Sequence, residues 1–188
     1  GAVLVFLYRH QLAGTLGLFE QPYVDEAAEL VASTAEHLAI AREVAGRCAV
    51  LLRNDGALPI ANRARKVLLT GPYAASADHL GAWVQHWGTP ARSLLEALAD
   101  AAPKLALTTL PGASFLEHEP VDSEAIMAAA EQSDLVIVAV GEPSQLSGEA
   151  SSRADIRLPG EQEALIHAFA YSCAPFVFVL ITGRPLVM

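Results

Sequence analysis

Four short apolar runs, rich in β-branched and aromatic side chains, alternate along the chain with amphipathic stretches. The runs cover residues 67–70, 105–108, 134–140 and 175–182. The last two are almost continuously hydrophobic, which is typical of strands buried on both faces of a parallel sheet. Alternation of such strands with helices predicts the α/β class, a mainly parallel sheet flanked by helices. We therefore expect an α/β sandwich.

Helix signals fall between these runs. Thr89-Pro90, Asp122 and Gly160 each precede a stretch with apolar residues at helical spacing, and the first pair combines a capping hydroxyl with a first-turn proline. A longer helix is predicted over residues 27–52, and Asn54-Asp-Gly56 is expected to end it. Its apolar residues recur at steps of three and four, which makes one stripe along the helix. The stripe consists of Leu38, Ala41, Ala45, Cys48 and Leu52.

The expected domain organisation is simple. Residues 25–188 are predicted to form one α/β domain, and residues 1–24, with Pro22 in an extended stretch, are predicted to be a remnant of a preceding region and a linker. The chain begins with Gly1 and stops soon after Gly183-Arg-Pro-Leu. We expect it to be a piece of a longer protein, with the sheet incomplete at its C-terminal end.

Composition narrows the possible functions. The 188 residues are 53% hydrophobic and 18% charged, which excludes a disordered chain, and the net charge of −9 argues against a broad basic surface for nucleic acid. The apolar opening is interrupted at Arg9 and His10, well short of a membrane-spanning helix. Neither the two cysteines nor the six histidines show metal-ligand spacing, so no metal or cofactor is expected.

The loop after the third apolar run is the first candidate for chemistry. Ligands of open parallel sheets bind at the carboxyl ends of the strands, and long loops in compact domains are often functional. This loop carries Glu142, Glu149, Arg153 and Asp155 in a Gly/Ser-rich setting, so it could present a general acid over a cleft. The spacing of these residues alone favours an ordinary solvated loop with surface charges over a catalytic loop. Glycine patterns that cradle phosphates are missing, so a nucleotide-binding interpretation rests on fold analogy alone.

Two tryptophans form a second candidate. Trp83 and Trp87 lie four residues apart in a glycine-flanked loop after the first strand. On a helical turn this spacing places both rings on one side. Aromatic faces pack on sugar rings, but tryptophan also fills protein cores, and the spacing favours neither interpretation.

An ordered set of motifs carries a family resemblance over nearly the whole chain from about residue 16. The chain closely resembles the second, α/β-sandwich domain of glycoside hydrolase family 3, and the bacterial periplasmic-type β-glucosidases look nearest. The matching stretches are Leu16-Gly-Leu-Phe-Glu-Gln-Pro-Tyr-Val24, His37-Leu-Ala-Ile-Ala-Arg-Glu-Val-Ala45, Val50-Leu-Leu-Arg-Asn54, Leu58-Pro59, Thr70-Gly-Pro72, Leu80-Gly-Ala-Trp83, Val138-Ala-Val-Gly-Glu142, Ser147-Gly-Glu-Ala-Ser-Ser-Arg153, Leu158-Pro-Gly160 and Gly183-Arg-Pro-Leu186.

The resemblance implies a retaining exo-β-glycosidase whose sugar binds between this domain and an N-terminal (β/α)8 barrel. Its two carboxyl groups are about 5–5.5 Å apart, one nucleophilic and one acid/base. The nucleophile is an Asp of the barrel, outside this chain, and the acid/base role falls by motif position on Glu149. Glu142 competes for it, but we interpret Glu142 as structural because it directly follows the strand. Arg153 is expected to position Glu149 or the loop, or to contact substrate.

The resemblance also implies the ligands. Trp87 resembles an aromatic residue of the aglycone-side subsite, and Trp83 looks like its neighbour. Substrates would be β-linked glucoside or xyloside oligosaccharides or aryl glycosides, and the chain without its barrel is expected to be inactive. The alternative is a non-catalytic carbohydrate-binding or scaffold module of the same fold, in which the loop of Glu149 is only surface. Arg184 is expected in a structural salt bridge and Asp155 in fixing the loop.

Overall fold

The computed structural model describes residues 34–60, 64–84, 91–169 and 174–188. The chain divides into two compact units, Gly1–Arg53 and Asn54–Met188. The predicted linker, residues 1–24, lies outside the described residues. No helix in the described part of the chain is both long and apolar enough to cross a membrane.

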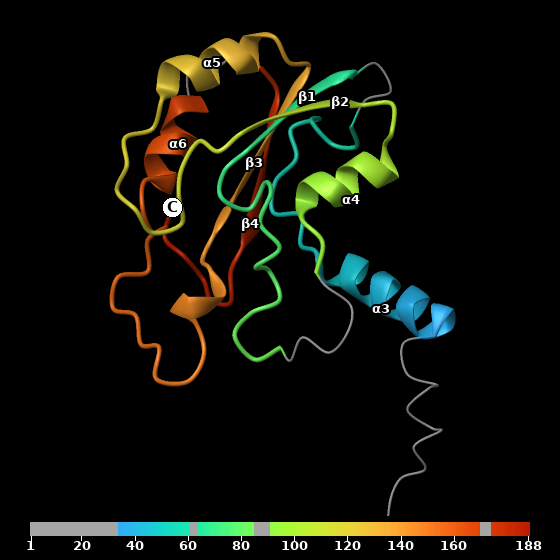
Figure 1. Ribbon diagram of the computed structural model, residues 1–188, viewed down its shortest axis with the longest axis vertical. Helices are drawn as coiled ribbons and strands as arrows, with labels where there is room; N and C mark the ends of the chain where they lie inside the picture. The colour runs from blue at the N-terminus through green and yellow to red at the C-terminus, as the bar shows by residue number, and fades with distance from the viewer. Residues whose placement is uncertain (1–33, 61–63, 85–90, 170–173) are drawn as a thin grey trace, which may run out of the picture. The chain divides into compact units, whose positions relative to one another are not determined.

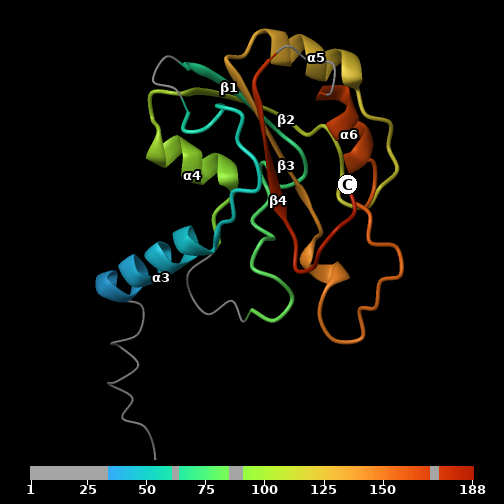
Figure 2. The same cartoon turned by 180° about the vertical axis from the view of Figure 1, so that it is seen from behind.

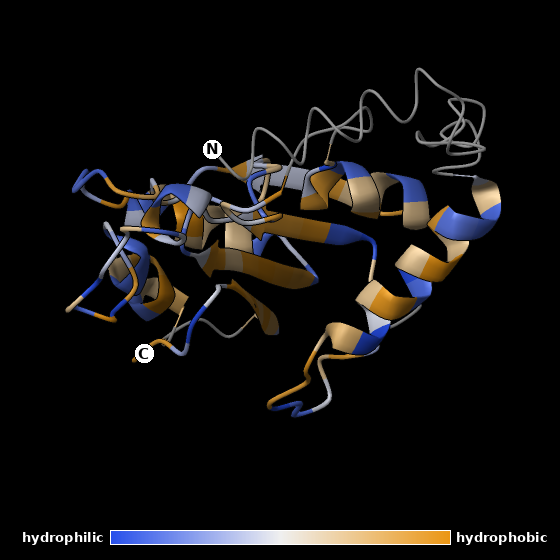
Figure 3. Ribbon diagram, turned by 90° about the horizontal axis from the view of Figure 1, so that it is seen from below, coloured by the Kyte–Doolittle hydropathy of each residue, from blue (hydrophilic) through white to orange (hydrophobic). Residues whose placement is uncertain are grey.

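The first unit contributes one described helix, α3 (Ala35–Cys48). The Thr34 side chain caps it by accepting a hydrogen bond from the His37 backbone N–H. The helix ends at Cys48 because Ala49 takes extended backbone angles, so the prediction that it continues to Leu52 was wrong. Apolar spacing alone does not mark where the backbone leaves the helical region. None of the α3 residues is buried, and the ribbon of the helix carries both hydrophobic and hydrophilic colours (Figure 3).

The second unit is built on a four-stranded parallel sheet, and its strands follow the predicted apolar runs closely. They are β1 (Lys66–Thr70), β2 (Ala106–Leu110), β3 (Leu135–Gly141) and β4 (Phe176–Ile181), in the order β2-β1-β3-β4 (Figure 1). Every residue of β3 is buried, as its continuous hydrophobic run predicts. The α/β prediction is confirmed, and the carboxyl ends of all four strands meet at one edge of the sheet.

Helices cover both faces of this sheet (Figures 1 and 2). On one face α5 (Ser123–Glu131) and α6 (Gln162–Phe169) bury Ile126 and Phe169 against β1 and β3. On the other face α4 (Leu94–Ala101) packs its leucines against the second apolar cluster of β1 and β3. Because both faces of the central strands are buried, their sequences are hydrophobic at nearly every position.

The structure describes the starts of α5 and α4. Asp122 caps α5 as predicted, accepting a hydrogen bond from the Ala125 N–H. The α4 helix begins at Leu94 with Ser93 as its N-cap, and the predicted pair Thr89-Pro90 lies outside the described residues. Ser93 and Glu96 form a reciprocal capping box, which satisfies backbone donors at both positions and fixes the start of the helix there.

Candidate active site

The long loop after β3 starts at a position that only glycine can occupy. Gly141 has φ of 150°, and a Cβ atom there would lie 1.8 Å from the carbonyl oxygen of Ile181 in the adjacent strand. The chain then leaves the sheet through Glu142 and the short 3-10 helix η1 (Ser144–Leu146), and it returns to the fold at α6. The loop thus departs from the carboxyl edge of the most buried strand.

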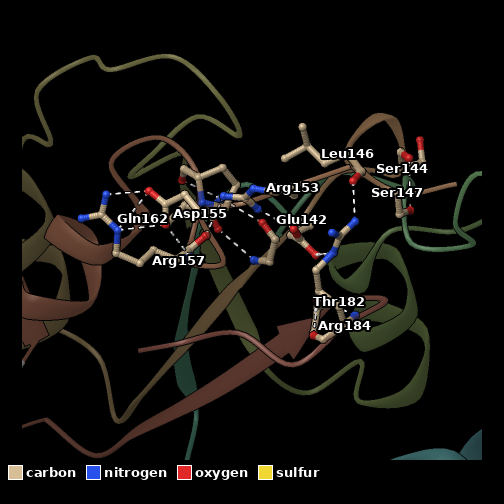
Figure 4. A network of polar contacts seen from close by, with 12 residues as sticks. Glu142, Ser144, Leu146, Ser147, Arg153, Asp155, Arg157, Gln162, Thr182 and Arg184 are labelled. Atoms are coloured by element: carbon tan, nitrogen blue, oxygen red, sulfur yellow. Dashed lines mark hydrogen bonds and ion pairs between the residues drawn. The ribbon is translucent and has the colours of Figure 1, made fainter. Parts of the chain in front are cut away.

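The Glu142 side chain forms a buried ionic cluster at the base of the loop. Its carboxylate is 1% exposed and lies between the guanidinium groups of Arg153 and Arg184 (Figure 4). Arg153 Nη1 donates a short hydrogen bond to Oε1. Thr182 Oγ1 donates to Oε2 at 2.9 Å, whereas Arg184 Nε lies 3.2 Å from Oε2 without the angle of a hydrogen bond. Two cations and a hydroxyl therefore offset the loss of water around this carboxylate.

Two further buried side chains fix the ends of the loop. The Gln162 amide accepts from the Gly141 N–H at 2.8 Å and donates to the carbonyl oxygens of Gly141 at 2.9 Å and Pro159 at 3.0 Å. The phenol of Tyr73 donates to the carbonyl oxygen of Glu142. Burial, with the negative charges of Asp78 and Glu142, raises the pKa of Tyr73 to about 12, so the phenol stays a donor at neutral pH.

Glu149 lies at the exposed tip of this loop, between two residues with left-handed backbone. Gly148 has φ of 107° and Ala150 has φ of 60°, a region that residues with a Cβ atom rarely adopt. A Cβ atom added to Gly148 would lie 2.9 Å from Ala82 Cβ and 3.7 Å from Trp83 Nε1. The turn that carries Glu149 therefore sits directly against the loop of Trp83.

The candidate residues of the sequence fall in different places. Trp83 is 71% exposed beside the tip, and Trp87 lies outside the described residues. Arg153 binds Glu142 and the loop backbone. Asp155 accepts hydrogen bonds from Arg157, which lower its pKa. Arg184 forms the expected salt bridge with Glu142.

The two glutamates have opposite environments. Glu142 is enclosed by cations and has no open path to a bound ligand, so it does not suit a group that must exchange protons with substrate and water. Glu149 is exposed and stands beside an exposed indole. The geometry therefore fits an exchanging acid at Glu149 and a structural carboxylate at Glu142.

A separate recess of about 310 Å³ opens at the ends of β1 and β2. It is mainly apolar, with Pro72, Leu110 and Phe115 in its wall, and neither Glu149 nor Trp83 lines it. Among the described residues no group of three or more histidine, cysteine, aspartate or glutamate side chains is placed to hold a metal ion.

Sequence reasoning missed the side chains that fix the loop. Gln162 lies three residues before Leu165 and seven before Phe169, so it shares the buried face of α6 with them. A polar residue in phase with an apolar helical stripe is the signal that identifies it. Tyr73 and Thr182 carry no comparable signal, because each lies in a loop that follows a strand, where no periodicity marks a buried position.

Comparison with known proteins agrees with this architecture. The family model described as "Glycosyl hydrolase family 3 C-terminal domain" matches residues 49–188. The periplasmic beta-glucosidase of Salmonella typhimurium is 32% identical over 92% of this chain and 26% of its own length. A probable exo-1,4-beta-xylosidase of Aspergillus terreus is 32% identical over 77% of this chain and 18% of its own.

A solved structure extends the likeness to three dimensions. The beta-glucosidase from Listeria innocua, in complex with glucose, is 34% identical and superposes with a TM-score of 0.78, covering 94% of this chain and 24% of that one. The chain thus spans about a quarter or less of the length of these relatives. With its parallel sheet and the loop after β3, the chain belongs to glycoside hydrolase family 3, of which it carries the C-terminal domain.

Proposed function

We propose that this domain supplies the general acid/base, Glu149, of a retaining exo-β-glycosidase that hydrolyses β-linked glucosides or xylosides. The nucleophile would be an aspartate of a barrel domain outside this chain. The observation that carries the proposal is the position of Glu149, an exposed carboxyl group at the tip of a loop whose base is fixed and whose turn contacts the loop of Trp83. The names of the relatives, β-glucosidase and β-xylosidase, support the substrate class.

The proposed mechanism gives Glu149 two tasks. In the first step its protonated form donates to the glycosidic oxygen while the nucleophile attacks the anomeric carbon, and the alcohol leaves. In the second step its ionised form removes a proton from the water that attacks the glycosyl-enzyme. The exposed indole of Trp83 would stack on the departing aglycone, and Trp87 is proposed for the same role. Arg153 would act through the loop that it holds.

The leaving group gives the sharpest test. In the full-length protein we expect Glu149→Gln to lower hydrolysis of a β-glucoside with a poor leaving group, such as methyl β-glucoside, by at least about 100-fold. The kcat/KM for 2,4-dinitrophenyl β-glucoside should change far less, because that phenolate leaves without protonation, whereas its kcat should fall because the second step loses its base. Glu131→Gln, at an exposed position on α5, is the matched control and should leave both rates unchanged. Equal losses on both substrates would move the acid/base role to another residue.

The chain alone provides a second comparison. Without the nucleophile, the 188-residue protein should hydrolyse neither substrate above the buffer rate. Robust turnover by the purified chain would contradict the division of the catalytic pair between two domains.

A further inference from the structure

The two arginines that bind Glu142 also hold the two limbs of the loop. Arg184 comes from the turn after β4, and its Nη2 donates to the carbonyl oxygen of Leu146 in η1 at 2.6 Å. Arg153 lies on the returning limb, and its Nη2 donates to the carbonyl oxygen of Arg157 at 2.7 Å. One buried carboxylate therefore connects the outgoing limb, the returning limb and the end of β4 (Figure 4).

Glu149 lies between these two anchor points. It follows Leu146 by three residues and precedes Arg153 by four, so only a short segment of backbone separates it from either anchored residue. Within the turn that carries Glu149, the Ser147 N–H donates to the carbonyl oxygen of Ser144 at 3.1 Å, and the Ser151 N–H donates to the carbonyl oxygen of Gly148 at 3.3 Å. A shift of either limb would move the Glu149 carboxyl group with it.

We propose that Glu142 is a positioning residue, whose carboxylate, through Arg153 and Arg184, sets the place of the acid/base loop tip. The inference rests on the proposed role of Glu149. Glu142 touches no substrate, but it balances the charges of two arginines that would otherwise repel each other. A glutamine at this position keeps the shape and loses the negative charge, so it no longer draws both guanidinium groups to one point. Misplacement of a catalytic group by about 1 Å can lower a rate by about 100-fold.

The test compares Glu142→Gln with Glu149→Gln in the full-length protein, with fold monitored by circular dichroism. We expect Glu142→Gln to lower kcat/KM for methyl β-glucoside by about 10–100-fold while kcat/KM for the dinitrophenyl glucoside changes by less than about threefold. We also expect non-additivity. Added to Glu149→Gln, the second substitution should have little further effect on the methyl glucoside, because no acid remains to be positioned.

The outcomes separate the two proposals. If Glu149→Gln is selective for the poor leaving group but Glu142→Gln lowers both rates equally, the positioning role is wrong and the function of Glu149 stands. If Glu149→Gln itself is unselective, the proposed function fails and the positioning role fails with it. Should Glu142→Gln not fold, Arg153→Lys decides, because lysine lacks the rigid fork whose two nitrogens bind Glu142 and the Arg157 carbonyl at the same time. Arg153→Lys should then show the same selectivity, and an equal loss on both substrates overturns the proposal.

Discussion

Replacement of Gln162 by leucine tests the base of the loop, apart from any catalysis. The buried amide satisfies the N–H and the C=O of Gly141 at the end of β3 and the C=O of Pro159 where the loop returns. Leucine has a similar volume and no hydrogen-bonding atoms, so these backbone groups would lose their partner without gaining water. The chain should remain folded but become less stable.

The expected loss follows from the groups left unsatisfied. Each buried donor or acceptor without a partner costs about 1–3 kcal/mol, so the two groups of Gly141 alone amount to about 2–6 kcal/mol. Burial of the apolar leucine side chain offsets about 1–2 kcal/mol of this. We expect a net loss of about 3 kcal/mol in the free energy of unfolding. With a urea slope of about 2 kcal/mol/M, the midpoint would fall by about 1.5 M.

Urea titration of the 188-residue chain, followed by far-ultraviolet circular dichroism, measures this shift. Gln145→Leu is the matched control, because Gln145 is exposed in η1, and its midpoint should stay close to that of the unsubstituted chain. If Gln162→Leu lowers the midpoint no more than Gln145→Leu does, the amide does not hold the ends of the loop, and the account of a fixed base is wrong.

Two other predictions concern the core and the pH dependence of stability. Phe169 is fully buried under the sheet, so Phe169→Ala should lower the free energy of unfolding by about 3–5 kcal/mol. Phe178→Ala is the control, because that side chain is 41% exposed, and it should lower the free energy of unfolding clearly less. Comparable losses of the two variants in urea titration would contradict this packing. The pKa of Tyr73 is about 12 in the folded chain and about 10 when unfolded, so its contribution to stability is complete below pH 10 and is lost as the pH rises toward 12. Tyr73→Phe should be less stable at pH 8 but should lose less stability between pH 9 and pH 11 than the unsubstituted chain; equal losses would show that the phenol titrates normally.

The sheet was predictable because burial on both faces leaves a direct mark on the sequence. The run at residues 134–140 has no polar side chain after Asp134, and it became the fully buried β3. Asp134, the polar residue directly before β3, has a structural reason to be there. Its carboxylate accepts hydrogen bonds from the N–H groups of Arg65 and Lys66 at the start of β1. The end of α3 was not predictable, because residues 49–52 continue the apolar pattern although the helix has ended and Ala49 has extended backbone angles.

The candidate site was predictable only in part. Motif position singled out Glu149 and Arg153, but the partner of Arg153 is a carboxylate eleven residues earlier, and sequence spacing does not reveal that pairing. The contact between the turn at Gly148 and the loop of Trp83 joins segments that are distant along the chain. Such contacts depend on how the loops of neighbouring parallel strands fold back at one edge of the sheet, and a local pattern carries no record of it.

Addition of azide to the Glu149→Gln protein tests the assignment of Glu149 most directly, because the reaction product then reports which group acted as the base. In the full-length Glu149→Gln protein with 2,4-dinitrophenyl β-glucoside, the glycosyl-enzyme should accumulate because no base activates water, and azide, which needs no base, should attack it. We predict a faster turnover with azide and a β-glucosyl azide product, identified by nuclear magnetic resonance. Glucose as the sole product, with a rate that azide leaves unchanged, would contradict the acid/base role of Glu149.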